Sequence, residues 1–186
     1  MRFRCWLCIL AFVASGFASE APEKQSKAFS FSIVFADGVA KYARLRQELE
    51  GSVSAQKSTN QSEEITDRQD QLTGVIANAR RDARQGEIFT NDVVKEFREI
   101  IRKAFRERGG AAMRKTIEER DPIQPIVLKV NAVYPDDLPR TTMSPTLLRR
   151  LPALPKELAY RIIGRALVLQ DTKTNLIVDF IPNAIP

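Results

Sequence analysis

The distribution of proline constrains the fold of this chain more than any other feature of its sequence. Nine of the ten prolines lie at or beyond Pro122, and only Pro22 precedes that point. Proline lacks a backbone N–H and breaks the interior of a helix, so long helices are favoured before Pro122 and disfavoured after it. We therefore expect an α+β protein that divides near Asp121, with a helical region at 19–121 followed by a Pro-rich connection and a small antiparallel sheet at 122–186. The two parts should form one globular unit.

Apolar residues in the first part recur every three or four positions, which is the period of an amphipathic helix. One such stripe predicts a helix over 31–53. A second stripe predicts a helix over 63–84, ended by Gly86.

The third helical stripe has the clearest end signals. Thr90 or Asn91 is a suitable cap at its start, and Gly109 and Gly110 form its stop. A short fourth helix is expected near 112–120. Each stripe needs a partner, so these three to four helices should pack as an antiparallel bundle.

Two elements are expected before the C-terminal pattern begins. The stretch 126–135 is rich in β-branched residues, which predicts a strand. Ser144 followed by Pro145 is typical of a helix start, with serine as the cap and proline at the first helical position. This short helix should end before Pro152.

Residues 159–182 alternate in a way that predicts a three-stranded antiparallel meander, so that the whole sheet has three to four strands. Gly164 and Arg165 suit a two-residue hairpin turn, and the next connection is a four-residue loop at 172–175. The expected pairs are Ile163 with Ala166, Ile162 with Leu167, Tyr160 with Leu169, Asp171 with Leu176 and Leu169 with Val178.

This register divides the sheet into an apolar face, interrupted by Asp171, and a mixed face that carries Arg161 and Asp179. The two aspartates then lie on opposite faces, where they cannot act together as an acid–base pair. Arg161 and Asp179 lie two strands apart on the same face. We interpret them as a structural ion pair across the sheet, with contact to a ligand as the alternative.

The N-terminus has the layout of a secretory signal peptide at 1–18. Arg2 and Arg4 precede a short apolar run that is followed by small residues. Gly16 and Ala18 suit the −3 and −1 positions, which places cleavage after Ala18. We expect an exported protein with no transmembrane segment once the signal is removed, and an uncleaved anchor is the alternative.

Removal of 1–18 takes away both cysteines, Cys5 and Cys8, and the chain contains no histidine. This excludes a disulfide, a thiol nucleophile, an imidazole base and a Cys/His metal site, so no cofactor or metal is expected. The mature chain keeps 27 basic and 23 acidic residues, a net charge of +4 that mildly favours anionic surfaces. Few aromatic residues accompany the basic runs, and nucleic acid is not an expected partner.

Ser54 and Lys57 have the Ser-x-x-Lys spacing in which a lysine activates a serine nucleophile. The S-D-N element that supports such a site is absent, and K-T-N at 173–175 stands where K-T-G is expected. A hydrolase-type enzyme using this pair, or carboxylates, is the alternative to a binding function.

The third helix also has a basic side on which an anionic partner could dock. The candidate binding residues there are Lys95, Arg98, Arg102 and Arg106. Glutamates are interleaved with them, as is usual on solvated helix faces. An ordinary solvated face is therefore the alternative interpretation.

Two segments resemble an uncharacterised family of exported bacterial proteins: QGEIFTNDVVKEFREIIR (85–102) and SPTLLRRLPALPKELAYRIIGRALVLQDTKTNLIVDFIPNAIP (144–186). The hairpin YRIIGRALVLQDTKTNLIVDFI is distantly similar to a module that ends several small periplasmic proteins, one of them with a role in nickel and cobalt homeostasis. The resemblance implies an envelope protein but no site residues. The metal role is not carried over, because the chain has no histidine.

From these patterns we expect a non-enzymatic periplasmic or secreted binding or accessory protein, which acts through a helix face or the mixed sheet face. Its partner would be an unidentified envelope protein or an anionic surface. A binder of anionic envelope polymers is a further alternative, distinguished by a steep dependence on salt.

Overall fold

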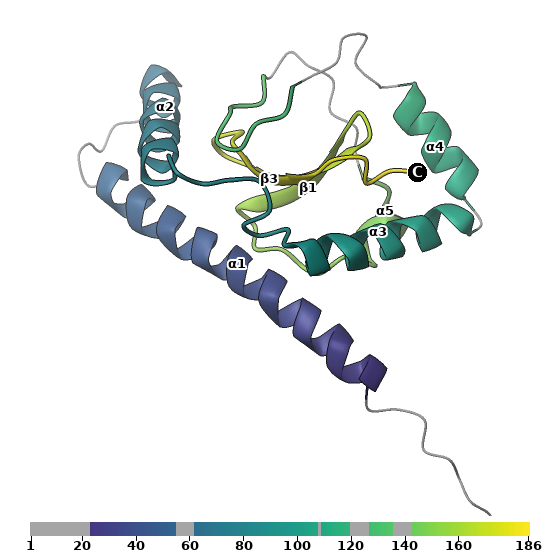
Figure 1. The fold of residues 1–186 in the computed structure, drawn as a ribbon. Coiled ribbons are helices and arrows are strands. Elements are labelled where there is room, and N and C mark those ends of the chain that lie inside the picture. Colours follow the sequence, from purple (N-terminus) through teal and green to yellow (C-terminus); the bar gives the residue numbers. More distant parts are fainter. Residues whose placement is uncertain (1–22, 55–61, 108, 120–126, 136–142) are drawn as a thin grey trace, which may run out of the picture.

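The computed structural model describes residues 23–54, 62–107, 109–119, 127–135 and 143–186. Helices occupy the first part of the chain and a three-stranded antiparallel sheet, in the order β1-β2-β3, occupies the last (Figure 1). The α+β prediction is therefore confirmed. None of the described helices is long and apolar enough to cross a membrane. The predicted signal peptide lies outside the described residues.

The first two helices, α1 (Glu23–Ser54) and α2 (Ser62–Ala79), lie against each other, and α1 continues past the body of the protein (Figure 1). α1 begins earlier than the sequence predicts, and α2 ends earlier. After α2 the chain turns toward the sheet, where Arg80 donates a hydrogen bond to the carbonyl of Val178 (3.1 Å). Gly86, with φ 93°, lies in the loop that follows and does not end the helix.

The next pair of helices is α3 (Asn91–Arg106) and α4 (Gly110–Glu118). Thr90 takes the cap position of α3, as predicted, although its side chain makes no capping hydrogen bond. α4 begins directly at Gly110, where a Cβ atom would overlap the backbone of Phe105. The tight corner between the two helices therefore requires glycine at this position.

The sheet consists of β1 (Leu158–Ile163), β2 (Ala166–Asp171) and β3 (Ile177–Ile181). The predicted register of the β1–β2 hairpin is confirmed at every pair. Gly164 has φ 55° in the turn, a conformation that glycine adopts without steric cost.

The pairing of β2 with β3 departs from the prediction by one residue. Gln170 pairs with Ile177 as expected, but a β-bulge at Leu169/Gln170 then places Leu169 opposite Asp179 instead of Val178. A shift of one residue exchanges the two faces of a strand. Ile181 therefore joins the helix-facing core in place of Phe180.

The prediction of a strand at 126–135 is wrong for the residues that the structure describes there, 127–135. They run beside β3 but form only a single antiparallel bridge, between Val133 and Leu176. Asn131 adopts φ 64° in a turn, which interrupts the extended backbone that a strand needs.

The predicted helix start at Ser144 is confirmed. The single-turn helix α5 (Pro145–Leu148) has Ser144 as its cap, and the serine hydroxyl accepts a hydrogen bond from the N–H of Leu147 (3.3 Å).

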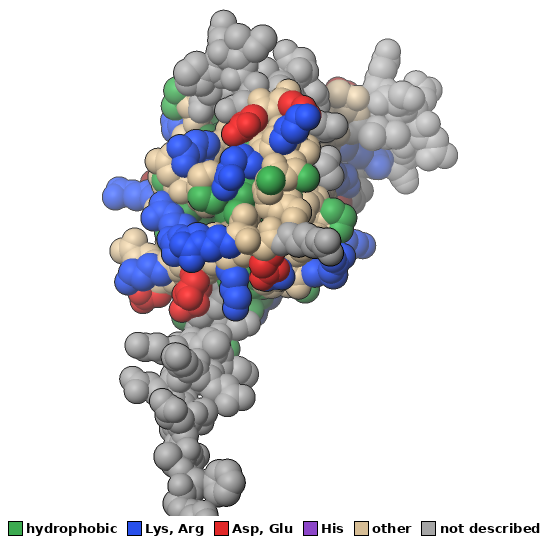
Figure 2. All heavy atoms as spheres, turned by 90° about the vertical axis from the view of Figure 1, so that its right-hand side faces the viewer, with side chains coloured by type: hydrophobic (Ala, Val, Ile, Leu, Met, Phe, Trp, Pro, Cys, Tyr) green, Lys and Arg blue, Asp and Glu red, His purple; other side chains and the backbone are tan. Residues whose placement is uncertain are grey.

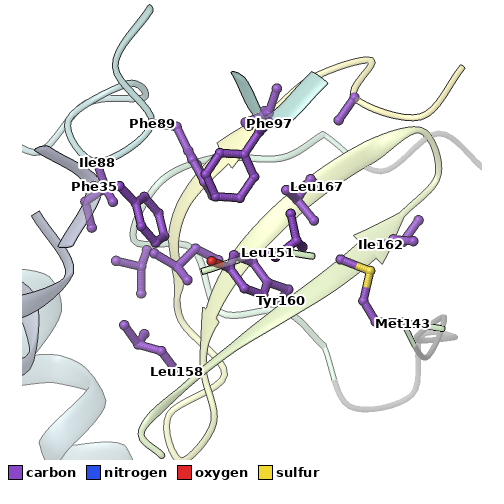
Figure 3. Close-up of a cluster of buried hydrophobic side chains, with 14 of the residues drawn as sticks. Phe35, Ile88, Phe89, Phe97, Met143, Leu151, Leu158, Tyr160, Ile162 and Leu167 are labelled. Atoms are coloured by element: carbon purple, nitrogen blue, oxygen red, sulfur yellow. The ribbon is translucent and has the colours of Figure 1, made fainter. Parts of the chain in front are cut away.

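The sheet has a hydrophobic cluster on each face. On the helix side, aromatic rings from α1, α3 and β1 meet: the ring centroids of Phe35 and Phe97 lie 5.1 Å apart, and those of Phe97 and Tyr160 lie 5.9 Å apart (Figure 3). On the other side Tyr134 is 1% exposed and covers Val168. The mixed face is therefore largely a second small core.

Candidate functional site

One side of α3 is buried and the other is charged. Phe97 and Ile101 are 0% exposed and fix the helix to the core. The four predicted binding residues follow one another along the charged side at intervals of three or four positions, as a helix requires, and all but the half-buried Arg98 are exposed. They are Lys95, Arg98, Arg102 and Arg106.

The first two of these cations are already engaged. Lys95 pairs with Asp92 at 2.9 Å, but both side chains are exposed and such a pair is weak. Arg98 donates through Nη2 to the carbonyl of Pro182 (2.8 Å), and its Nε atom is buried with no hydrogen-bond partner among the described residues. Arg98 therefore ties α3 to the C-terminal segment.

After Glu99, all the charged side chains of α3 are basic. Arg102, Lys103 and Arg106 are exposed, and none has an acidic partner within the part of the chain that the structure describes. Glu107, which follows them, is held by Arg150 through Nη1–Oε1 at 2.9 Å and a second Nη2–Oε2 contact. We call Arg102, Lys103 and Arg106 the basic end of α3.

Figure 2 faces the end of the molecule at which α3 finishes, and Lys and Arg side chains predominate over acidic ones there. Lys103 was not among the binding residues predicted from the sequence. Its place directly after Arg102 in the series of basic residues on this helix could have indicated it. The favourable position of these cations at a helix C-terminus also contributes to stability, because the helix dipole is negative there.

The predicted ion pair between Arg161 and Asp179 is contradicted. Arg161 donates from Nε to Oε1 of Gln170 (3.3 Å) on the outer face of the sheet. Asp179 is paired with Leu169 across the bulge and faces the helices instead. The bulge therefore places Asp179 on the same side as Asp171, not on the opposite side as predicted.

The carboxylate of Asp179 is 0% exposed and accepts hydrogen bonds from three backbone N–H groups of the α2–α3 connection. The donors are Gly86 (2.9 Å), Ile88 (2.9 Å) and Phe89 (2.8 Å). Such a cradle of N–H groups satisfies a buried anion without any cation. Asp179 is therefore a structural residue, which the local sequence pattern does not reveal.

Asp171, also 0% exposed, is the centre of a buried polar cluster between α1 and the sheet. Its Oδ2 atom accepts from the Tyr42 hydroxyl (2.8 Å) and from Arg46 Nε (2.7 Å). Its Oδ1 atom accepts from the backbone N–H groups of Lys173 (2.9 Å) and Thr174 (3.0 Å). Each carboxylate oxygen thus accepts two hydrogen bonds, so the protein itself fills the acceptor positions of the group.

The surroundings shift the pKa values of three side chains in and beside this cluster. Burial, reinforced by the negative charge of Asp171, raises the pKa of the Tyr42 hydroxyl far above its usual value. Burial by itself would lower the pKa of Arg46, but Asp171 and Glu50 more than offset this and raise it. A hydrogen bond from Lys173 (2.6 Å) lowers the pKa of Glu50, against a smaller opposing effect of burial. The cluster therefore serves to hold α1 on the sheet.

A cleft of about 450 Å³ opens beside this cluster, between α1 and the α2–α3 connection. Its lining includes Arg80, which bonds Asn131 Oδ1 (3.0 Å) and the carbonyl of Val178 and lies 5.1 Å from the centre of the Tyr42 ring. The protein itself thus engages this buried cation, and we assign the cleft no ligand.

The catalytic candidates are not brought into a described site. Ser54 is the last residue of α1, and Lys57 lies outside the described residues. The described residues contain no cluster of three or more Asp, Glu, Cys or His side chains suited to a metal ion.

Comparison of the chain with protein-family models, with curated proteins and with solved structures found no match. The resemblance to exported bacterial proteins therefore stays a prediction, and the charges and packing of the described residues are the basis for assigning a function.

Proposed function

We propose that the protein is a non-enzymatic binding or accessory protein of the bacterial envelope, periplasmic or secreted, which binds an acidic protein partner through the basic end of α3. The observation that carries this proposal is the exposure of Arg102, Lys103 and Arg106 on one helix without acidic partners in the described structure. Phe97 and Ile101 anchor the opposite side of the helix in the core. Binding would therefore order only side chains, which keeps its entropic cost low.

Export is the first part of the proposal to test. It is supported by the sequence pattern of residues 1–18. Expression of the full chain in a Gram-negative host should give a periplasmic product whose intact mass and N-terminal sequence begin at Ser19. A product that keeps Met1 and stays with the membrane would instead support the uncleaved anchor.

The partner is tested by mild cross-linking and pull-down of the tagged mature protein from its native envelope fraction. The informative variant is Arg102→Gln/Lys103→Gln/Arg106→Gln. It removes the three positive charges and keeps polar side chains that can still form hydrogen bonds. Arg44→Gln/Arg81→Gln/Arg84→Gln is the matched control, because it removes three exposed cations elsewhere.

We expect the native protein and the control to recover the same stoichiometric protein partner, and the basic-end variant to lose it. Recovery should also fall as salt is raised to physiological strength, since exposed charges are screened. Equal recovery with both triple variants would contradict the proposal. Retention of polysaccharide or another anionic polymer without a protein partner would support the polymer alternative instead.

A further inference from the structure

A separate feature of the molecule is an apolar cavity of about 340 Å³ between α4 and α5. Its walls include Phe105, Met113, Ile117, Met143, Leu147 and Ile162. These residues come from the end of α3, from α4, from the α5 region and from β1. The cavity therefore lies where three helices meet the edge of the sheet, away from the buried Asp171 cluster.

The side chains that line the cavity favour an apolar ligand such as a hydrocarbon chain. Among the described lining residues none is charged, and both hydroxyl groups are engaged: that of Ser144 accepts the N–H of Leu147, and that of Thr116 donates to the carbonyl of Ala112 (3.0 Å). A polar ligand would lose its hydration there without recovering hydrogen bonds. The two methionines can adapt to a flexible chain, and the volume lies in the range of small-molecule sites.

An exposed positive charge lies beside this cavity. The guanidinium of Arg114 lies 5.9 Å from the centre of the Phe105 ring, which lines the cavity. Arg114 is exposed and pairs with no acidic side chain among the described residues, whereas its neighbour Lys115 pairs with Glu119 (3.7 Å). An apolar cavity with an exposed cation beside it complements a molecule that has a hydrocarbon chain and an anionic end.

We propose that the cavity between α4 and α5 binds the chain of a single-chain anionic amphiphile, of which a fatty acid is the simplest, with its carboxylate against Arg114. This site uses residues other than the basic end of α3, so it does not depend on the proposed protein partner. It gives the molecule a lipid-binding activity of its own.

Dodecanoate is a suitable probe, and its binding to the mature protein can be measured by calorimetry below the critical micelle concentration. Ala112 is exposed and lines the cavity, so Ala112→Trp should fill the entrance without disturbing the core. Ala111, exposed on the same helix, does not line the cavity, and Ala111→Trp is the matched control. We expect one saturable site, weakened about tenfold or more by Ala112→Trp and less than about twofold by Ala111→Trp.

The charged end is tested with a second pair of variants. Arg114→Gln should weaken dodecanoate binding about fivefold, whereas Lys115→Gln should change it little, and dodecyltrimethylammonium should bind more weakly than dodecanoate. Equal binding of the two surfactants would overturn the assignment of the anionic end. Equal affinities of the two tryptophan variants, or no saturable binding at all, would overturn the site itself.

Failure of this inference can be told apart from failure of the proposed function. The basic-end triple variant should still bind dodecanoate with native affinity, because Arg102, Lys103 and Arg106 do not line the cavity. Loss of partner capture with dodecanoate binding intact would count against the partner alone.

Discussion

Asp171 and Asp179 are buried carboxylates that join the end of the chain to its earlier parts. Asp171 is bound by two side chains of α1, and Asp179 by backbone N–H groups of the α2–α3 connection. A buried carboxylate is stable only when its acceptor positions are filled, and each donor then fixes the position of its own segment. These two residues thus have structural roles that resemble those of a crosslink.

Replacement of Asp171 tests how much this cluster contributes to stability. In Asp171→Asn the charge is lost, and Arg46, whose side chain is 5% exposed, loses its buried counter-ion and keeps only the partly exposed Glu50 (2.6 Å). Removing one member of a buried pair typically costs about 3–5 kcal/mol, so we expect a loss of this size in the free energy of unfolding by urea.

Asp82→Asn is the control for that measurement. Asp82 contacts Arg81, but its side chain is 95% exposed, and its replacement should change the free energy of unfolding by less than about 0.5 kcal/mol. If the two variants were equally stable, the buried cluster would not contribute as described.

Glu50 predicts a specific dependence of stability on pH. Its pKa in the folded protein is lowered from an ordinary value of 4.5, chiefly by the hydrogen bond from Lys173. A lowered pKa adds stability above the ordinary value, and this stability is lost as the pH falls through the folded value. The difference in unfolding free energy between the native protein and Glu50→Gln should therefore be present at neutral pH and shrink below pH 4.5. Glu50 is partly exposed, so the difference should stay below about 1 kcal/mol. A difference that grows on acidification would contradict this.

At the scale of the elements, local patterns predicted the hairpin and failed at the bulge. Gly164 in the turn fixes the β1–β2 register from neighbouring residues alone. The bulge in the β2–β3 pairing turns Asp179 toward the α2–α3 connection. The residues that bind Asp179 there, such as Ile88, lie about 90 positions away in sequence. No local pattern contains such a distant interaction, and the predicted faces of Asp179 and Phe180 were therefore wrong.

The same limit applies to the candidate site. Helical spacing placed Lys95, Arg98, Arg102 and Arg106 on the side of α3 away from Phe97, but only Lys95, Arg102 and Arg106 are exposed, and Arg98 is half-buried. Spacing does not show which cations are engaged. That depends on contacts such as the one from Arg98 to Pro182, which lie far apart in the chain.

Gly109 and Gly110, at the corner between α3 and α4, should be sensitive to substitution for two different reasons. At Gly109 the φ of 100° disfavours a side chain, but no atom lies within 4 Å of the position that a Cβ would take, so Gly109→Ala should cost about 1–2 kcal/mol. At Gly110 the added Cβ would overlap the carbonyl of Phe105, so Gly110→Ala must displace α4. We expect a loss of about 3 kcal/mol or more in thermal or urea unfolding.

Gly110→Ala should also weaken dodecanoate binding, because α4 forms a wall of the apolar cavity. Gly109→Ala should leave that binding nearly unchanged. Equal stabilities for the two alanine variants would show that the corner is more tolerant than its geometry indicates.

Considered as a whole, the molecule has a firmly packed centre and a less firmly packed side. All six residues of β2 are buried between the other two strands and both hydrophobic clusters. α2 contacts mainly α1, and among its described residues only Leu72 and Ile76 are fully buried. Local opening is easiest where few apolar contacts must be broken.

Hydrogen exchange should reproduce this difference. We expect the backbone amides of β2 to exchange about 100-fold more slowly than those of α2, or slower still. The measurement is exchange under native conditions, followed by NMR or mass spectrometry. Equal protection of the two elements would indicate that the molecule opens only as a single cooperative unit.

The contacts of Asp171 also determine when this protein can finish folding. Tyr42 and Arg46 meet it across 129 and 125 positions of sequence. Contacts between such distant positions form late, because the intervening chain must first be brought together. During synthesis α1 leaves the ribosome long before the strand that completes its buried side. Until β2 has been synthesised, the chain therefore lacks the carboxylate that completes the buried polar cluster of α1.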